Sequence, residues 1–256
     1  MPDFTGSGSP LTPAGFTTAR KMSDIDDATL WSILAVETAG CGFLPDRRPQ
    51  ILFERHVFSR LTGARFDADH PDISAPTSGA HGEGGAHQYS RLEEALSLDE
   101  NAALRSASWG LGQIMGNNFK SAGFANVDDM VAAMVGSEDE QLKAVSAFIR
   151  ANKMDQALRD RDWAGFASRY NGPNFAVNNY DGKLETFHDK YSTEGTPDLL
   201  VRAVQVHLMY KRFAPGTIDG VVGPNTIAAV KTFQASTGAV PDGIIDDALL
   251  ADLAKD

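Results

Sequence analysis

Residues 35–63 read AVETAGCGFLPDRRPQILFERHVFSRLTG, and this stretch decides the fold. Its first part completes a run of apolar residues at helical spacing: Leu30, Ile33, Leu34 and Val36. Ser23 stands before this run and has an acid three residues later, which is typical of a helix start. Gly40 is typical of a helix end. The pattern predicts a helix over residues 24–39.

The second half of the stretch predicts another helix. Pro49 suits the first turn of a helix, and Gly63 suits the position after the last turn. At about 100° per residue, one apolar stripe contains Ile51, Glu54, Phe58 and Leu61. Glu54 therefore falls in the middle of an apolar face, whereas Arg55 and His56 point away from it.

These two predicted helices carry the candidate catalytic acids. Glu37 lies at a helix C-terminus, where the macrodipole disfavours negative charge, and apolar neighbours also raise a carboxyl pKa. A carboxyl group protonated near neutral pH is what general-acid cleavage of a glycosidic bond requires. Glu54 on an apolar face costs several kcal/mol unless it is paired or faces a cleft. The alternatives are an exposed Glu37 without a role and a Glu54 in a structural ion pair with an arginine.

Outward from this stretch, the chain divides into segments of different character. Residues 1–20 are rich in Gly, Ser, Thr and Pro and predict a flexible arm, and residues 64–90 predict a long loop of functional importance. Further helices are predicted over 91–105, 107–116, 127–135, 137–152, 155–170 and 179–191. The fold class is therefore mainly α, with a catalytic domain over 21–191, a linker over 192–197 and a second domain over 198–256.

The second domain contains an internal repeat. IDGVVGPNTIAAV at 218–230 and PDGIIDDALLADL at 241–253 share an Asp-Gly turn, two aliphatic residues and a helical pattern. Together with a helix over 198–212 they predict a three-helix unit. Such a small unit has only a marginal core, which is typical of an accessory module.

Two motifs supply candidate substrate-binding residues. SWGLGQIMG at 108–116 contains three glycines, each unfavourable in a helix by about 1 kcal/mol, so something must approach its backbone closely. Either tight helix packing or a sugar-binding wall formed by Trp109 and Gln113 explains this. RYNGP at 169–173 ends a helix, and Tyr170 and Asn171 also suit recognition of hydroxyl and amide groups.

Composition limits the partners of the protein. The chain has 256 residues, with 34 acidic against 23 basic side chains and a net charge of −11, which disfavours nucleic acid as a partner. The single cysteine, Cys41, excludes an internal disulfide, and the six histidines lack the spacing of a zinc site, so neither metal nor cofactor is expected. No apolar run suggests membrane insertion, and no signal peptide is recognised, so we expect synthesis in the cytoplasm. We also expect a monomer.

The motifs together resemble a known family. The stretch 35–63, then GGAHQY, SWGLGQIMG and RYNGP, resembles the N-acetylmuramidase domain of modular phage endolysins over about residues 24–191. Glu-Thr at 37–38, GLGQ at 110–113 and YNG at 170–172 are more distantly similar to goose-type lysozymes and lytic transglycosylases, with Thr38 in place of their usual serine. Residues 198–256 resemble the three-helix peptidoglycan-binding domain 1.

This resemblance implies a lysozyme-like catalytic domain that cleaves the β-1,4 bond between N-acetylmuramic acid and N-acetylglucosamine. It assigns the general acid to Glu37 and the second carboxylate to Glu54. It also implies bacterial peptidoglycan as the partner and action in the periplasm after release through a holin-made lesion. Three alternatives remain: a lytic transglycosylase, a zinc amidase or endopeptidase, and a wall-binding protein without catalytic activity.

Overall fold

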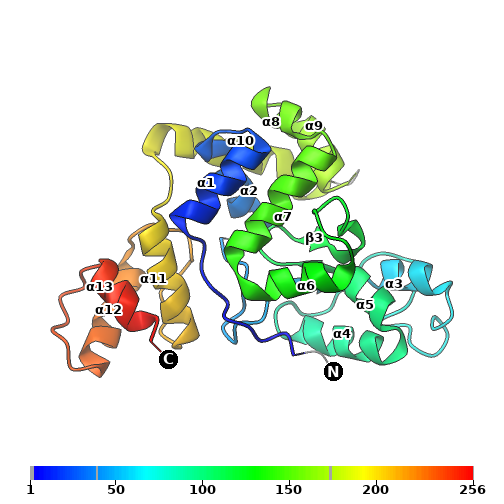
Figure 1. Cartoon of the computed structure of the whole chain (residues 1–256), viewed down its shortest axis with the longest axis horizontal. Helices are drawn as coiled ribbons and strands as arrows, with labels where there is room; N and C mark the ends of the chain where they lie inside the picture. Colours follow the sequence, from blue (N-terminus) through cyan, green and yellow to red (C-terminus); the bar gives the residue numbers. More distant parts are fainter. Residues whose placement is uncertain (1–2, 39, 173–174, 256) are drawn as a thin grey trace.

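The computed structural model describes residues 3–38, 40–172 and 175–255, and the fold is mainly helical, as expected (Figure 1). The helices are Pro13–Ser23 (α1), Asp27–Thr38 (α2), Arg55–Thr62 (α3), His87–Leu98 (α4), Glu100–Arg105 (α5), Val127–Gly136 (α6), Glu138–Ala151 (α7), Asp155–Arg159 (α8), Trp163–Tyr170 (α9), Tyr180–Glu194 (α10), Leu199–Tyr210 (α11), Pro224–Ser236 (α12) and Asp247–Leu253 (α13). The strands are Ile51–Phe53 (β1), Ala107–Trp109 (β2) and Ile114–Met115 (β3), and two short 3-10 helices are Gly116–Asn118 (η1) and Phe175–Asn178 (η2).

Helix α2 is largely enclosed within the larger lobe, which precedes α11 in the chain. Its Leu30, Ile33 and Leu34 have no solvent exposure, and the helix packs along α10. Its apolar residues cover most of the helix circumference, which is typical of a fully enclosed helix. The last turn of α2 is therefore carried to a fixed place inside the lobe, and that turn contains Glu37.

A small antiparallel sheet replaces one predicted helix and the first turn of another. The strand order is β1-β2-β3, with Ile51 opposite Trp109 and Ser108 opposite Met115. The predicted helix after Pro49 was wrong in its first turn, because residues 51–53 pair with β2 and the helix begins only at Arg55.

The predicted helix over residues 107–116 was wrong throughout, because that segment forms a hairpin. Gly110 has a φ of +67° and Gln113 a φ of +48°, values that a right-handed helix excludes. The glycines serve a turn with close neighbours, since a Cβ at Gly112 would overlap the side chain of Val145. The prediction that other groups approach the backbone at these glycines was correct, but the glycines lie in a hairpin and not in a helix.

The N-terminal arm predicted as flexible is ordered over its described part. Phe4, Leu11 and Phe16 are buried, and α1 packs along α7. Thr12 caps α1 and is itself held by Asp139, with its backbone N–H 2.8 Å from Oδ1 and its hydroxyl 2.7 Å from Oδ2. Phe4, Leu11 and Phe16 are too widely spaced to form a local pattern, but all three belong to the core of the lobe.

The C-terminal module consists of α11, α12 and α13, on the left in Figure 1. The two Asp-Gly turns of the repeat precede α12 and α13, and each is held by a glutamine from the preceding helix. Gln205 accepts from the N–H of Gly220 at 2.8 Å, and Gln234 accepts from that of Gly243 at 2.9 Å. The module has a small core of its own, formed by Val204, Leu208, Ala229, Val230, Phe233, Leu249 and Leu253.

The predicted linker over 192–197 begins inside an element, because α10 continues to Glu194. The chain then turns at Gly195, whose φ of +96° favours glycine, and α11 begins four residues later. None of the described helices has the length and apolar character needed to cross a membrane. Pro173, predicted to follow the end of α9, lies outside the described residues.

Candidate active site

One cleft of about 520 Å³ receives five of the six predicted site residues. Glu37 reaches it from α2, Glu54 from the junction of β1 and α3, Gln113 from the hairpin, and Tyr170 and Asn171 from the end of α9. The remaining lining residues are Leu52, His56, Val57, Arg60, Ser108, Met115, Asn117 and Asn118. Two carboxyl groups therefore share one polar cleft with hydroxyl and amide side chains.

Glu37 lies where its proton is retained. Burial raises the pKa of the Glu37 carboxyl to about 7, although a hydrogen bond from Tyr180 acts in the opposite direction. The hydroxyl of Tyr180, at the start of α10, donates to Oε1 of Glu37. A hydrogen bond to the charged form lowers a carboxyl pKa, so burial outweighs it here. The carboxyl is partly protonated at neutral pH and is aimed by a buried tyrosine.

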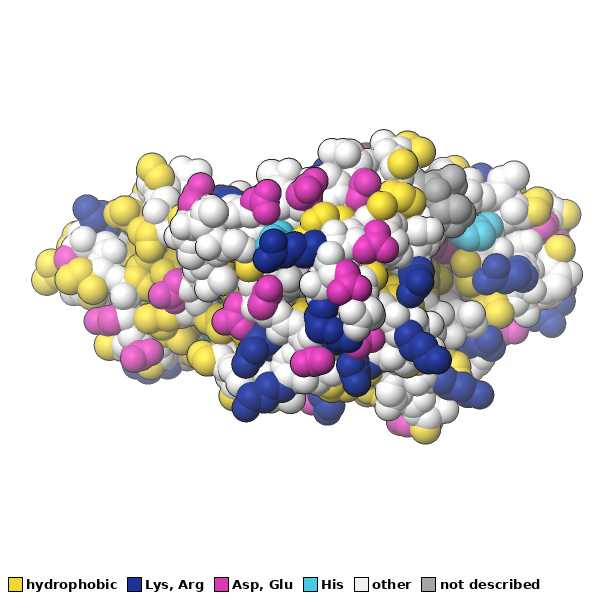
Figure 2. Space-filling view, turned by 90° about the horizontal axis from the view of Figure 1, so that it is seen from above, with side chains coloured by type: hydrophobic (Ala, Val, Ile, Leu, Met, Phe, Trp, Pro, Cys, Tyr) yellow, Lys and Arg dark blue, Asp and Glu magenta, His cyan; other side chains and the backbone are white. Residues whose placement is uncertain are grey.

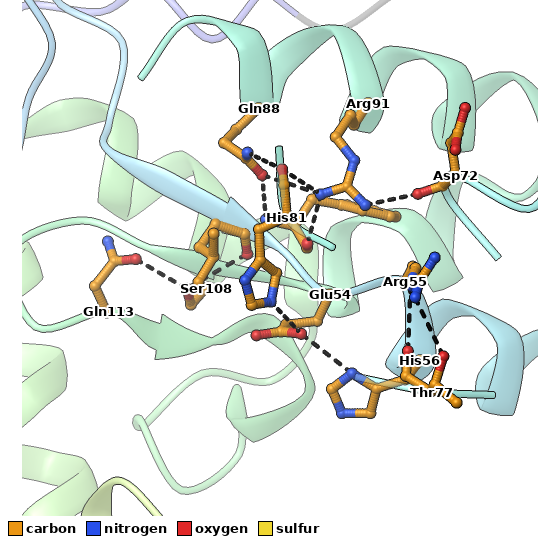
Figure 3. Close-up of polar contacts among 12 residues, drawn as sticks. Glu54, Arg55, His56, Asp72, Thr77, His81, Gln88, Arg91, Ser108 and Gln113 are labelled. Atoms are coloured by element: carbon orange, nitrogen blue, oxygen red, sulfur yellow. Dashed lines mark hydrogen bonds and ion pairs between the residues drawn. The ribbon is translucent and has the colours of Figure 1, made fainter. Parts of the chain in front are cut away.

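Glu54 is the N-cap residue of α3 and not a member of its apolar stripe. Its side chain is 18% exposed, and its Oε2 lies 3.1 Å from Nδ1 of His56 and 3.1 Å from Nε2 of His81 (Figure 3). The expectation that His56 points away was wrong, because α3 begins one residue after Glu54. The partners are histidines and not the arginine of the structural alternative.

The loop that carries His81 is fixed from behind by α4. Gln88, fully buried, donates to the carbonyl oxygens of His81 and Glu83 at 2.7 Å each and accepts from the N–H of Phe53 at 3.0 Å. Arg91 donates to the carbonyl oxygen of His81 at 3.0 Å (Figure 3). The long loop over 64–90 thus contributes directly to the surroundings of Glu54.

Gln113 lines the cleft while holding the hairpin turn. Its Nε2 donates to the carbonyl oxygen of Gly110 at 2.9 Å and to that of Gln50 at 3.3 Å. Its Oε1 accepts from the hydroxyl of Ser108 at 2.9 Å. Both amide protons are used. The amide oxygen has two lone pairs and accepts one hydrogen bond here, from Ser108, so it can accept one more.

Tyr170 joins the hairpin to α9. Its hydroxyl donates to the carbonyl oxygen of Gly112 at 2.8 Å, and its ring stacks on Phe166 with 5.1 Å between ring centroids. Asn171 caps α9 through its backbone N–H and lines the cleft.

Trp109 does not belong to the cleft. It has no solvent exposure, its Nε1 donates to the carbonyl oxygen of Leu104 at 3.1 Å, and its ring lies 5.6 Å from that of Phe4. The prediction that Trp109 stacks on a sugar was wrong, because strand alternation turns this side chain into the core.

Sequence reasoning missed Tyr180 and the pairing of both histidines with Glu54. Tyr180 is separated from Glu37 by 143 positions, and no local pattern links them. The glycine-rich run around His81 did predict a functional loop, but nothing in its spacing indicated a carboxylate partner. Among the described residues, no group of three or more His, Cys, Asp or Glu side chains is arranged to hold a metal ion.

The chain matches two protein-family models and resembles a solved structure. Residues 26–192 match the family model of N-acetylmuramidase, and residues 198–253 match that of a peptidoglycan binding domain. The crystal structure of the Burkholderia AP3 phage endolysin is similar, with 41% sequence identity and a TM-score of 0.66 over 73% of this chain and 72% of that chain. A search of curated proteins finds no match.

Proposed function

We infer the reaction of the cleft from one premise, that the chain belongs to the N-acetylmuramidase family. The chain is a peptidoglycan hydrolase of the endolysin kind, with a module for binding peptidoglycan. The bond we propose for cleavage is the β-1,4 bond between N-acetylmuramic acid and N-acetylglucosamine. The observation that carries this proposal is the environment of Glu37, whose pKa is raised to about 7 in a cleft that also holds Glu54.

Glu37 acts as the general acid in this proposal. It donates its proton to the glycosidic oxygen as the bond to the muramic acid ring breaks, and the ring passes through an oxocarbenium-like state. A group with a pKa near the working pH combines a usable protonated fraction with a strong driving force for transfer. The hydroxyl of Tyr180 fixes the carboxyl and accompanies the negative charge that forms on it.

Glu54 supplies the second carboxylate. It stabilises the developing positive charge or activates the attacking water. The hydrogen bond between Nε2 of His81 and Oε2 of Glu54, at 3.1 Å, holds that oxygen in the cleft, and Nδ1 of His56 lies at the same distance from it. Gln113, Tyr170 and Asn171 position the sugar through hydroxyl and amide groups. The remaining acceptor capacity of Gln113 suits a sugar hydroxyl or an acetamide N–H.

The proposal extends to the place of action. Peptidoglycan is the partner, and the protein works on the wall in the periplasm as a monomer. The C-terminal module carries the exposed apolar side chains of Val221, Val222, Val240 and Ile244, and Figure 2 shows hydrophobic side chains gathered at that end of the molecule. With a net charge of −11, attraction to an anionic wall is weak, so contact rests on such local surfaces.

Mass spectrometry of digested, purified peptidoglycan tests the reaction. We expect fragments ending in a reducing muramic acid. A 1,6-anhydro product would assign the chain to the lytic transglycosylases, which use the same acid without water. Free stem peptide, with activity lost in EDTA and restored by zinc, would assign it to the amidases.

The variant Glu37→Gln tests the assigned acid in the same assay. We expect a loss of roughly 10²–10⁴ in rate, because the amide keeps the shape of the side chain but has no proton to donate. Circular dichroism checks that the fold is kept. More than a tenth of the parental rate would remove Glu37 from the mechanism.

A further inference from the structure

A buried ion pair joins the C-terminal module to the catalytic lobe. Arg202 of α11 and Glu138 of α7 both have no solvent exposure. Nη1 of Arg202 lies 2.6 Å from Oε2 of Glu138, and Nη2 lies 2.7 Å from Oε1. This two-pronged geometry fixes the angle between the partners as well as their distance.

Both partners also hold the segment that follows the helix of Glu37. The guanidinium of Arg202 donates through Nη2 to the carbonyl oxygen of Gly40. Oε1 of Glu138 accepts from the N–H of Gly42 at 2.8 Å, and Oε2 accepts from the N–H of Leu11 at 2.8 Å. The ion pair therefore binds the backbone at Gly40 and Gly42, three and five positions after the proposed acid.

Packing brings the same segment against the module. Gly40 has a φ of +93°, and a Cβ there would overlap the carbonyl oxygen of Ile218, in the first Asp-Gly repeat. Cys41 and Phe43 form a separate buried cluster with Val206 and Ile218, two residues from each domain. The segment over 40–43 is enclosed by the module on one side and by α7 on the other.

From this geometry we propose that Arg202 is a positioning residue of the catalytic site, and that the C-terminal module completes the support of Glu37. The inference rests on the proposed role of Glu37 as the acid. Arg202 touches no reacting atom; it acts through Glu138 and Gly40 on the end of α2. The module is thus part of the catalytic unit in addition to being a wall anchor.

Stability alone is a poor reason for this arrangement. Two charges withdrawn from water lose hydration that their attraction barely restores, and apolar residues of the same volume often stabilise a fold as well or better. The charged pair adds defined hydrogen-bond geometry, because it fixes the carbonyl group of Gly40 and the N–H group of Gly42 in the segment that follows Glu37. A displacement of about 1 Å in catalytic geometry can cost roughly 10² in rate.

The test compares two full-length variants at glycines with nearly the same φ. Gly40→Ala adds a methyl group against Ile218, whereas Gly195→Ala places one in open space, at φ values of +93° and +96°. Each is assayed on soluble glycan oligomers too short to reach the module. We expect Gly40→Ala to lower kcat at least tenfold with KM unchanged, and Gly195→Ala to keep the parental values.

A second readout follows the acid itself. We expect the Glu37 carboxyl, titrated by carbon-13 NMR, to lose at least half a pKa unit in Gly40→Ala, because a loosened segment admits water. Arg202→Lys keeps the charge but not the two-pronged contact, and we expect the same changes in smaller degree. If Gly40→Ala does not fold, the kcat and the Glu37 titration of Arg202→Lys test the inference instead.

The outcomes separate this inference from the proposed function. An inactive parent would contradict the proposed function. An active parent whose folded variants melt at a lower temperature, but keep the parental kcat and the parental titration of Glu37, would reduce Arg202 to a structural role and overturn the inference.

Discussion

Glu37 shows how one residue obtains its chemistry from its surroundings. Its pKa of about 7 lies above the ordinary value of 4.5, so the folded state holds a proton that the unfolded chain releases. The contribution of this carboxyl to the stability of the fold is therefore present below pH 4.5, is lost as pH rises towards 7, and amounts to about 3 kcal/mol.

Glu37→Gln removes this dependence. We expect the variant to melt higher than the parent at pH 8 and at the same temperature near pH 4.5, because only the ionised carboxylate is penalised by burial. Thermal unfolding followed by circular dichroism at both pH values measures this. A parent whose stability does not change across this range would contradict the burial of the acid.

Tyr180 makes a second prediction at the same carboxyl. Its hydrogen bond favours the charged form of Glu37, so Tyr180→Phe should raise the pKa of the acid further. The alkaline limb of the kcat profile should then move to higher pH. Tyr191→Phe, on the same helix α10, is the matched control. An unmoved limb would show that the contact does not tune the acid.

Glu54→Gln separates the two interpretations of the second carboxylate. A carboxylate kept for catalysis can be neutralised without loss of stability, whereas a structural buried pair loses roughly 3–5 kcal/mol when one partner is removed. We expect loss of activity at an unchanged melting temperature. Glu94→Gln is the control, because Glu94 pairs with His70 at 2.7 Å outside the cleft. Normal activity with clear destabilisation would make Glu54 architectural.

At the scale of elements, local chemistry predicted best where it alone decides the structure. The predicted helix over 137–152 is observed as α7, because the Ser137 hydroxyl accepts from the N–H of Glu140 and fixes its start. Strand β1 was missed because it pairs with β2 across more than fifty positions. Glu37 was singled out from the local pattern of its helix, whereas the helical stripe that singled out Glu54 is not formed. Tyr180 and His81 depend on contacts that only the folded chain creates.

The hairpin itself makes a prediction. Gly112→Ala would push a methyl group into Val145 and towards the hydroxyl of Tyr170. We expect a loss of roughly 1–3 kcal/mol from overpacking, together with reduced activity, because Tyr170 lines the cleft. Gly136→Ala, where a methyl group meets open space, should be close to neutral in urea unfolding. Equal stability of both variants would contradict the close approach.

At the scale of the whole molecule, composition and linker predicted two domains but not their contact. Net charge also does not show how charges are distributed over the surface. The chain carries a net charge of −11, but Lys and Arg side chains gather over the middle of the face shown in Figure 2. The buried pair of Arg202 and Glu138 joins positions 64 apart in sequence, and no motif marks either residue. Two residues that each look ordinary in sequence therefore form a buried charged contact between the domains.

Truncation after Glu194 tests that dependence. The fragment keeps Glu138 but loses Arg202, and the faces of Cys41 and Phe43 lose Val206 and Ile218. A buried pair deprived of one partner costs roughly 3–5 kcal/mol, which lowers the melting temperature of a domain this size by roughly 6–20 °C. Differential scanning calorimetry of the fragment and the full chain measures the difference.

Glu138→Gln, made in both forms, assigns the loss to the ion pair. In the full chain it leaves the guanidinium of Arg202 buried without a counter-charge, so we expect a cost of roughly 3–5 kcal/mol. In the fragment Glu138 is itself the unpaired charge. Its replacement by Gln removes that charge but keeps only one oxygen for the N–H groups of Leu11 and Gly42, so the two effects oppose each other and the cost should fall to roughly 1 kcal/mol or less. The difference is the coupling between the domains, and equal costs in the two forms would mean that the module stabilises the lobe through apolar contact alone.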